Sequence, residues 1–165
     1  MTEKILFYEK NETGIVHLNR PRSLNALDLE MAELFFFKLK EWQKNKNIKR
    51  VLLTGEGKVF CAGGDVKSLY LSSKTSNIKK NFFFTEYKLN YAINQFTKPY
   101  LSIWNGIVMG GGVGLSIFGN LRIATENSKF AMPETAIGFF PDVGGSYFLS
   151  RIKKNIGLYL ALTGN

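Results

Sequence analysis

The sequence has very few of the side chains that bind metals or form disulfides. It contains one cysteine, Cys61, and one histidine, His17, among 165 residues. A single cysteine cannot form an internal disulfide, which favours a reducing compartment. The same two residues cannot supply a metal cluster, and a serine triad would have to recruit His17 from the first strands. Carboxylates are therefore the best remaining candidates for acid–base or nucleophilic chemistry.

Long apolar runs are also lacking. Glycine or charge interrupts every apolar stretch, so no transmembrane helix and no membrane partner are expected. The opening residues, MTEKILFYEK, include acids and lack a long apolar core. They therefore favour a strand over a signal peptide, and no targeting segment is visible. On these observations alone the protein would be cytoplasmic.

Acidic residues are scarce relative to basic ones. The chain has 22 basic and 13 acidic residues and a formal net charge of +9. A basic surface favours anionic partners such as phosphates, nucleotides and nucleic acid. However, no basic stretch is interleaved with aromatic residues as in a nucleic-acid platform. Most of the charge is therefore expected on solvated surface, without a nucleic-acid partner.

Apolar periodicity and turn residues predict alternating strands and helices. A hairpin is expected over 4–10 and 14–19, and a helix over 28–44 that Asp28 or Asn25 caps and that buries Leu34 among other residues. The further expected strands are 50–55, 99–104, 121–125 and 129–132, and the segment 58–71 is expected to end a strand and, after a glycine turn, to form a short helix capped by Asp65. The further expected helices are 78–96, 146–152 and 155–164, and the segment 105–120 is expected to hold a loop, three glycines and a helix of small residues.

The predicted elements repeat as two short strands followed by a helix, about four times. A parallel sheet wound as a spiral, with helices outside, would carry this α/β pattern, and a doubly wound sheet is the alternative. The length fits one domain over residues 1–165. The chain ends directly after an apolar helix, which is typical of an interrupted domain.

Two glycine-rich segments, CAGGD (61–65) and GGGVG (110–114), stand at strand-to-helix junctions. The dinucleotide pattern G-x-G-x-x-G fails in every register, and no Gly-Lys-Ser/Thr is present. The hydrolase pattern G-x-S-x-G fails because Phe118 stands where the last glycine belongs. The glycines allow close packing, or they direct two backbone N–H groups at one oxygen as an oxyanion hole.

The segment FAMPETAIGFFPDVGG (130–145) places two acids, Glu134 and Asp142, among apolar residues with no Lys or Arg beside them. A buried charge is costly unless it is paired or hydrogen-bonded. The two carboxylates therefore lie on a surface loop, or they are buried because the protein uses their reactivity.

Four segments in order resemble the crotonase superfamily of acyl-coenzyme A enzymes: LNRPRSLNAL, FCAGGDVKSL, NGIVMGGGVGLS and FAMPETAIGFFPDVGG. The resemblance covers residues 4–164 and implies a spiral of ββα units. MGGGVGLS, MPETAIGFFPDVGG and LALTG are most similar to one branch, the 3-hydroxyisobutyryl-CoA hydrolases of valine breakdown. Members of the superfamily continue beyond the region matched here, so the C-terminal part of the fold is expected to be missing, and activity of the 165 residues alone is in doubt.

The resemblance implies roles for four residues. The N–H groups of Gly64 and Gly111 would form the oxyanion hole, and both glycines count as catalytic. Glu134 would be the general base or the nucleophile, and Asp142 would orient the substrate hydroxyl or relay a proton to the leaving thiolate. The superfamily's hydratases have a glutamate where this chain has Gly114, and usually glycine in place of Asp142, which favours the hydrolase branch.

Further residues are implied to bind substrate. Glu86 would join Gly111, Glu134 and Asp142 around the acyl group. The coenzyme A part would lie along Arg22, Ser23 and Leu24 and along Cys61, Ala62 and Gly63. Plainer roles remain for the acids: Glu134 as a helix N-terminal acid, Asp142 as a turn residue and Glu86 on a solvated helix face.

The leading functional hypothesis is hydrolysis of a short β-hydroxyacyl-CoA thioester, most readily 3-hydroxyisobutyryl-CoA. The alternatives are an enoyl-CoA hydratase or isomerase, and a non-catalytic acyl-CoA binder. No cofactor is expected, because coenzyme A is part of the substrate, and no metal is expected. The resemblance also implies a mitochondrial location and assembly as a homo-oligomer.

Overall fold

A computed structural model describes residues 3–165, so the first two residues of the predicted domain and of the opening segment lie outside it. The strands are β1 (Ile5–Lys10), β2 (Thr13–Leu18), β3 (Arg50–Gly55), β4 (Val59–Cys61), β5 (Tyr100–Trp104), β6 (Ile107–Met109), β7 (Leu121–Ala124) and β8 (Lys129–Ala131). The α-helices are α1 (Leu29–Lys44), α2 (Val66–Leu71), α3 (Ile78–Asn94), α4 (Gly111–Gly114), α5 (Gly145–Leu149) and α6 (Ile156–Thr163). Two 3-10 helices, η1 (Pro21–Ser23) and η2 (Pro133–Ile137), complete the elements.

The strands form two sheets. The larger has the order β1-β2-β3-β5-β7 and the smaller has the order β4-β6-β8. Within residues 3–165, only β1 and β2 pair antiparallel, and the other strand pairs are parallel. After the hairpin, each unit gives its first strand to the larger sheet and its second strand to the smaller. This alternation is the predicted spiral of ββα units, and it differs from the single sheet of a doubly wound fold.

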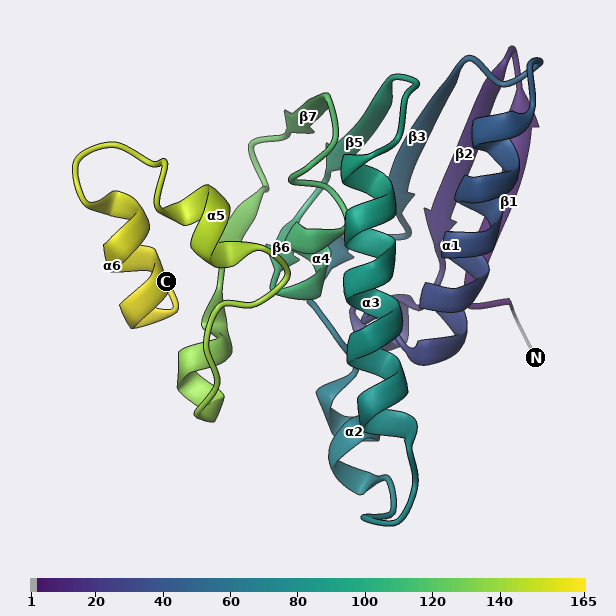
Figure 1. Cartoon of the computed structure of the whole chain (residues 1–165). Helices are drawn as coiled ribbons and strands as arrows, with labels where there is room; N and C mark the ends of the chain where they lie inside the picture. The colour runs from purple at the N-terminus through teal and green to yellow at the C-terminus, as the bar shows by residue number, and fades with distance from the viewer. Residues whose placement is uncertain (1–2) are drawn as a thin grey trace.

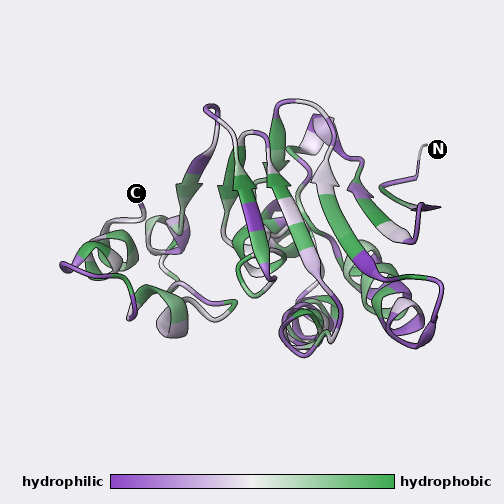
Figure 2. Cartoon of the chain, turned by 90° about the horizontal axis from the view of Figure 1, so that it is seen from above, coloured by the Kyte–Doolittle hydropathy of each residue, from purple (hydrophilic) through white to green (hydrophobic). Residues whose placement is uncertain are grey.

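The units advance from the hairpin at one end to α5 and α6 at the other (Figure 1). The two longest helices, α1 and α3, pack against each other and lie along one face of the larger sheet. Seen from above, the strands form a row with these helices on one side (Figure 2). Large side chains fill the interior, among them Phe35, Trp42, Phe60 and Tyr100.

Helix α1 begins where Asp28 caps it, because the Asp28 carboxylate accepts a hydrogen bond from the Met31 N–H at 2.9 Å. Asn25, the other candidate cap, is buried and instead binds backbone groups of the neighbouring loops. The prediction that Leu34 is buried is wrong, since it is 47% exposed. The buried stripe of α1 runs through Met31 and Phe35, and Leu34 lies roughly a third of a turn away from its centre.

Candidate active site

Two backbone N–H groups meet where β4 and β6 end. Because these strands are parallel neighbours, the loops that follow them leave the same edge of the smaller sheet. A Cβ atom built on Gly111 would lie 3.2 Å from the Gly64 nitrogen, so the two turns are in contact. Neither N–H donates a hydrogen bond to another group within residues 3–165. Two free donors this close can bind one oxygen atom, as an oxyanion hole requires.

The backbone of both turns requires glycine next to these donors. Gly63 has φ of +110° and Gly110 has φ of +48°, a region that side-chain-bearing residues rarely adopt. A Cβ on Gly110 would also meet a Glu134 carboxylate oxygen at 2.6 Å. The glycines therefore set the direction of the two N–H groups and admit a carboxylate beside them.

Asp65 anchors the first of these turns. Its carboxylate caps α2 by accepting from the Ser68 N–H at 3.0 Å, and it forms an ion pair with Arg20 at 2.9 Å. Burial alone would raise the pKa of Asp65, but the hydrogen bonds from Ser68 and Arg20 hold it below its usual value. The Arg20 guanidinium also donates to the Ala26 carbonyl, which ties the segment before α1 to the Gly64 turn.

Three carboxylates gather at the same place from three elements. Glu86 comes from α3 and one of its oxygens lies against Gly111, while Glu134 comes from η2 and lies against Gly110. Asp142 follows η2 in the loop before α5, and its charge acts on both glutamates. None of the three forms an ion pair within residues 3–165. The structure therefore brings together the acids that the sequence singled out.

Burial raises the pKa of all three groups, and repulsion adds to the rise at the two glutamates. Burial raises the pKa of Glu86 to about 8, and the charges of Asp142 and Glu134 add to the rise. Burial, with a contribution from Asp142, raises the pKa of Glu134 to about 7. Burial also raises the pKa of Asp142, against the hydrogen bond that it accepts from Tyr87. A carboxyl that titrates near neutral pH is suited to acid–base catalysis.

Several polar atoms of the cluster are buried without a hydrogen-bond partner in the described chain. They include Glu86 Oε1, Glu134 Oε2 and both amide atoms of Asn90. Glu86 is 2% exposed, so its assignment to a solvated helix face is excluded. Buried polar groups are normally paired, and unpaired ones mark a place where another molecule completes the bonding or where strain serves function.

Sequence reasoning missed two residues of this cluster, Tyr87 and Asn90. Tyr87 donates a hydrogen bond to Asp142 Oδ2 at 2.7 Å. Asn90 follows Glu86 by one helical turn and is 5% exposed. Phe82, Glu86 and Asn90 are spaced along one face of α3, and this spacing could have indicated that Glu86 and Asn90 are buried.

A cavity of about 210 Å³ adjoins the cluster. Its lining comes from α3, the segment after α4 and the loop after Asp142: Tyr87, Asn90, Tyr91, Asn94, Phe118, Val143 and Gly144. None of the three carboxylates and neither of the two free N–H groups lines it, so the cavity borders the cluster without containing the reactive groups.

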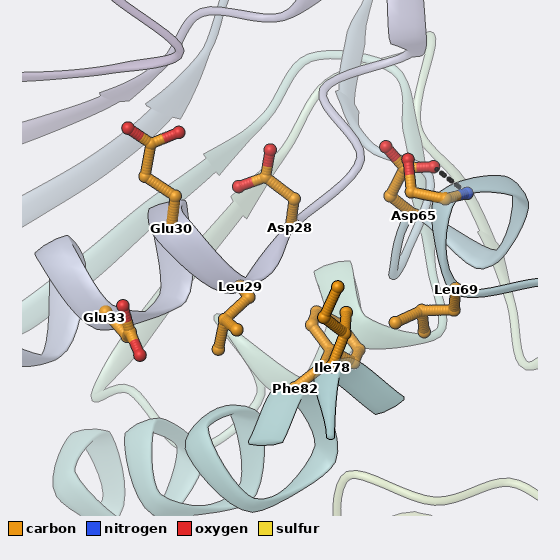
Figure 3. A pocket seen from close by; sticks show the side chains of 9 residues that line it. Asp28, Leu29, Glu30, Glu33, Asp65, Leu69, Ile78 and Phe82 are labelled. Atoms are coloured by element: carbon orange, nitrogen blue, oxygen red, sulfur yellow. Dashed lines mark hydrogen bonds between the residues drawn. The ribbon is translucent and has the colours of Figure 1, made fainter. Parts of the chain in front are cut away.

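A second hollow of about 330 Å³ lies between α1, α2 and α3, away from the three carboxylates. Figure 3 shows Asp28, Glu30 and Glu33 along one side and Ile78 and Phe82 along another. Asp28 and Glu30 bind the Lys4 ammonium at 2.8 and 2.6 Å. The Phe82 ring, which lines this hollow, also packs against Gly64. The hollow therefore borders the N–H pair from behind without containing the reactive groups.

Among residues 3–165, no group of three or more His, Cys, Asp or Glu side chains is placed to hold a metal ion. The same part of the chain contains no helix of the length and apolarity needed to cross a membrane.

The sequence of the chain was also compared with known protein families. A model described as enoyl-CoA hydratase/isomerase matches residues 13–165. The chain belongs to this family. The predicted crotonase resemblance is thereby confirmed, and with it the ββα spiral.

Curated proteins similar to this chain include several named "3-hydroxyisobutyryl-CoA hydrolase, mitochondrial". The one from Danio rerio is 49% identical over 163 residues, which are 98% of this chain and 43% of that protein. The one from Homo sapiens is 48% identical over 164 residues, which are 98% of this chain and 42% of that protein. The chain thus spans less than half the length of the curated relatives that it matches.

A solved structure in the same family has the same arrangement of strands and helices. The carnitinyl-CoA dehydratase from Mycobacterium thermoresistibile superposes with a TM-score of 0.95 at 45% identity. The alignment covers 99% of this chain and 48% of that protein.

In this chain, the residues expected to hold coenzyme A lie on two adjoining segments. Arg22 and Ser23 belong to η1 and Leu24 ends it, and the Leu24 carbonyl accepts a hydrogen bond from the Ala62 N–H at 3.0 Å. Cys61 is fully buried, and burial raises the pKa of its thiol to about 12. Its side chain is therefore an inert part of the core, and only its backbone is available to a ligand.

Proposed function

We propose that the protein hydrolyses a short β-hydroxyacyl-CoA thioester, with 3-hydroxyisobutyryl-CoA as the main candidate. The observation that carries the proposal is the position of the free Gly64 and Gly111 N–H groups beside three carboxylates that lack a cationic partner. The names of the similar curated proteins support the choice of substrate.

In this proposal the thioester carbonyl oxygen accepts hydrogen bonds from Gly64 and Gly111. Attack on the carbonyl carbon moves charge onto that oxygen, and removal of one such donor typically costs ~10²–10³ in rate. Glu134 either attacks the carbon itself or deprotonates the attacking water. Asp142 orients the substrate hydroxyl or passes a proton to the departing thiolate. Glu86, protonated near neutral pH, adds no negative charge beside the developing oxyanion.

The remaining parts of the proposal concern binding and location. Coenzyme A lies along Arg22–Leu24 and Cys61–Gly63, and it enters as part of the substrate, so no separate cofactor takes part. The acyl group lies among Gly111, Glu86, Glu134 and Asp142. The protein acts in mitochondria, as the names of the Danio rerio and Homo sapiens relatives suggest, and it forms a homo-oligomer.

A hydratase is the second candidate, since the family description includes that activity. Water addition in this family would need a carboxylate at the position of Gly114, by the resemblance described above. A Cβ on Gly114 would lie 2.6 Å from Val143 Cβ and 3.0 Å from Asn90 Nδ2, which leaves no room for a glutamate. The structure therefore favours hydrolysis over hydration.

The test is a panel of thioesters presented to the intact protein. Release of free thiol is followed with 3-hydroxyisobutyryl-CoA, 3-hydroxypropionyl-CoA and acetyl-CoA, and hydration is followed with crotonyl-CoA. We expect thiol release from the hydroxyacyl esters and no hydration. Hydration without thiol release would support the second candidate, and binding of all four esters without turnover would indicate an acyl-CoA binder.

A further inference from the structure

Tyr87 connects α3 to the loop that carries Asp142. Its phenolic O–H donates to Asp142 Oδ2 at 2.7 Å across 55 residues of sequence. No other side chain within residues 3–165 donates a hydrogen bond to this carboxylate. Tyr87 directly follows Glu86, so consecutive residues of one helix contact the Gly111 turn and the acid loop.

An aromatic series holds the Tyr87 ring against the same loop. The Tyr87 ring centroid lies 6.0 Å from that of Phe83, and the Phe83 centroid lies 5.9 Å from that of Phe139. Phe139 in turn stacks on Phe140 at 4.4 Å. Because Phe140 and Pro141 directly precede Asp142, the ring series fixes the approach of α3 to the carboxylate that the Tyr87 hydroxyl binds.

The backbone after Asp142 is in an unfavourable conformation. Val143 has φ of +40°, which is rare for a β-branched residue, and Gly144 has φ of +85°. Such a conformation persists only where the surroundings hold it. Val143 is 4% exposed and packs against Gly114 on the inner side, while the Tyr87 hydrogen bond holds Asp142 on the other.

We infer that Tyr87 is a positioning residue for Asp142. The Tyr87 hydroxyl fixes the direction of the Asp142 carboxylate and favours its ionised form. The titratable groups facing Asp142 are Glu86 and Tyr87 from α3 and Glu134 from η2. Helix α5 contributes a backbone contact, from the Gly145 N–H to the Asp142 carbonyl at 2.6 Å. Burial opposes ionisation of Asp142, and a hydrogen bond to the charged form favours it. The kinetic consequence of this inference rests on the proposed function, whereas its electrostatic consequence does not.

The electrostatic consequence is tested by a carboxyl ¹³C NMR titration of the intact protein labelled at aspartate. This chain contains three aspartates, Asp28, Asp65 and Asp142, and the signal that Asp142→Asn removes is assigned to Asp142. Tyr87→Phe keeps the ring and removes the hydroxyl. We expect it to raise the Asp142 midpoint by about half a pH unit or more, since the lost hydrogen bond favoured the anion. Asp65, which binds Arg20, serves as the internal control, and its midpoint should not move.

The kinetic consequence is tested on the same variant with the hydroxyacyl-CoA ester. We expect kcat to fall about tenfold and KM to change less than threefold. Tyr70→Phe, on exposed α2, is the matched control and should behave as the parent. An Asp142 midpoint that Tyr87→Phe leaves unchanged overturns the inference. A parent protein that releases no thiol overturns the proposed function, and the NMR result then decides the inference by itself.

Discussion

Val143 occupies the space into which any side chain at Gly114 would have to extend. A Cβ on Gly114 would lie 2.6 Å from Val143 Cβ, well inside the contact distance of two carbon atoms. Val143 itself is 4% exposed, with φ of +40°. The residue after Asp142 and the residue that ends α4 therefore depend on each other. Asp142 favours hydrolysis and the absence of a glutamate at Gly114 disfavours hydration, so this contact links the two features.

The first prediction follows from this contact. Gly114→Ala should destabilise the fold by about 1–3 kcal/mol, because the added methyl group overpacks a closed site. Val143→Gly removes the opposing Cβ and relieves the positive φ, so the double variant should be more stable than the sum of the two single effects by about 0.5–3 kcal/mol. Urea unfolding of the parent, both single variants and the double variant measures this coupling. Strictly additive effects would show that the two residues do not compete for space.

A methyl group at Gly111 should block the oxyanion site. In Gly111→Ala the new Cβ would stand 3.2 Å from the Gly64 nitrogen and would displace a Glu86 oxygen. We expect kcat/KM for thiol release to fall by about 10² or more, in line with the loss of an oxyanion donor. The control is Gly57→Ala, where the nearest atom would be Pro21 Cβ at 3.8 Å, although φ is +76°. Gly57→Ala should lose some stability but keep its activity. An equal loss of activity in both variants would contradict the assignment of Gly111 to the oxyanion hole.

Stability should depend on the charge of Glu86. Its pKa is raised to about 8 from an ordinary value near 4.5, so the fold prefers the protonated form. The stability that this preference contributes is fully present below about pH 4.5 and is lost as pH rises through 8. Glu86→Gln removes the charge, and it should therefore be more stable than the parent at pH 8.5, by up to about 4 kcal/mol, with the difference shrinking towards pH 4.5.

Chemical denaturation at several pH values measures this difference, and Glu126→Gln, an exposed glutamate, is the matched control. A difference between parent and Glu86→Gln that does not vary with pH would mean that Glu86 is not forced to ionise in an unfavourable site.

The repeating ββα pattern was predictable because most strands and helices have their own apolar period and glycines mark the junctions after β4 and β6. Strand β6 itself was expected to be a loop, because its three residues are too few to show a period. The two acids of the segment 130–145 were identifiable because carboxylates without basic neighbours are unusual in an apolar stretch. The burial of Glu86 was also encoded, since Phe82, Leu89 and Ile93 surround it on one face of α3. The residues alone left this burial open, because a single glutamate within a helix is more often solvated, and only the family resemblance placed Glu86 at the acyl group.

Other features depend on contacts between distant parts of the chain. The bond from Tyr87 to Asp142 joins residues 55 positions apart, and neither local sequence indicates the other. The choice of Asp28 over Asn25 as the α1 cap depends on the Glu56 and Val59 carbonyls, which accept hydrogen bonds from the Asn25 amide. Leu34 is exposed because the packing of α1 on α3 and the sheet selects one stripe of a helix whose apolar residues extend over a wider face.

The central claim is that Glu134 delivers the attack on a thioester held by the Gly64 and Gly111 N–H groups. The most direct test measures thiol release from 3-hydroxyisobutyryl-CoA by the intact parent protein and by Glu134→Gln, which keeps the shape of the side chain and removes the base. We expect Glu134→Gln to lower kcat by at least ~10² while affinity for coenzyme A changes little. The exposed control Glu126→Gln should match the parent. Thiol release by Glu134→Gln at the parent rate, or an equal loss of binding and turnover, would contradict it.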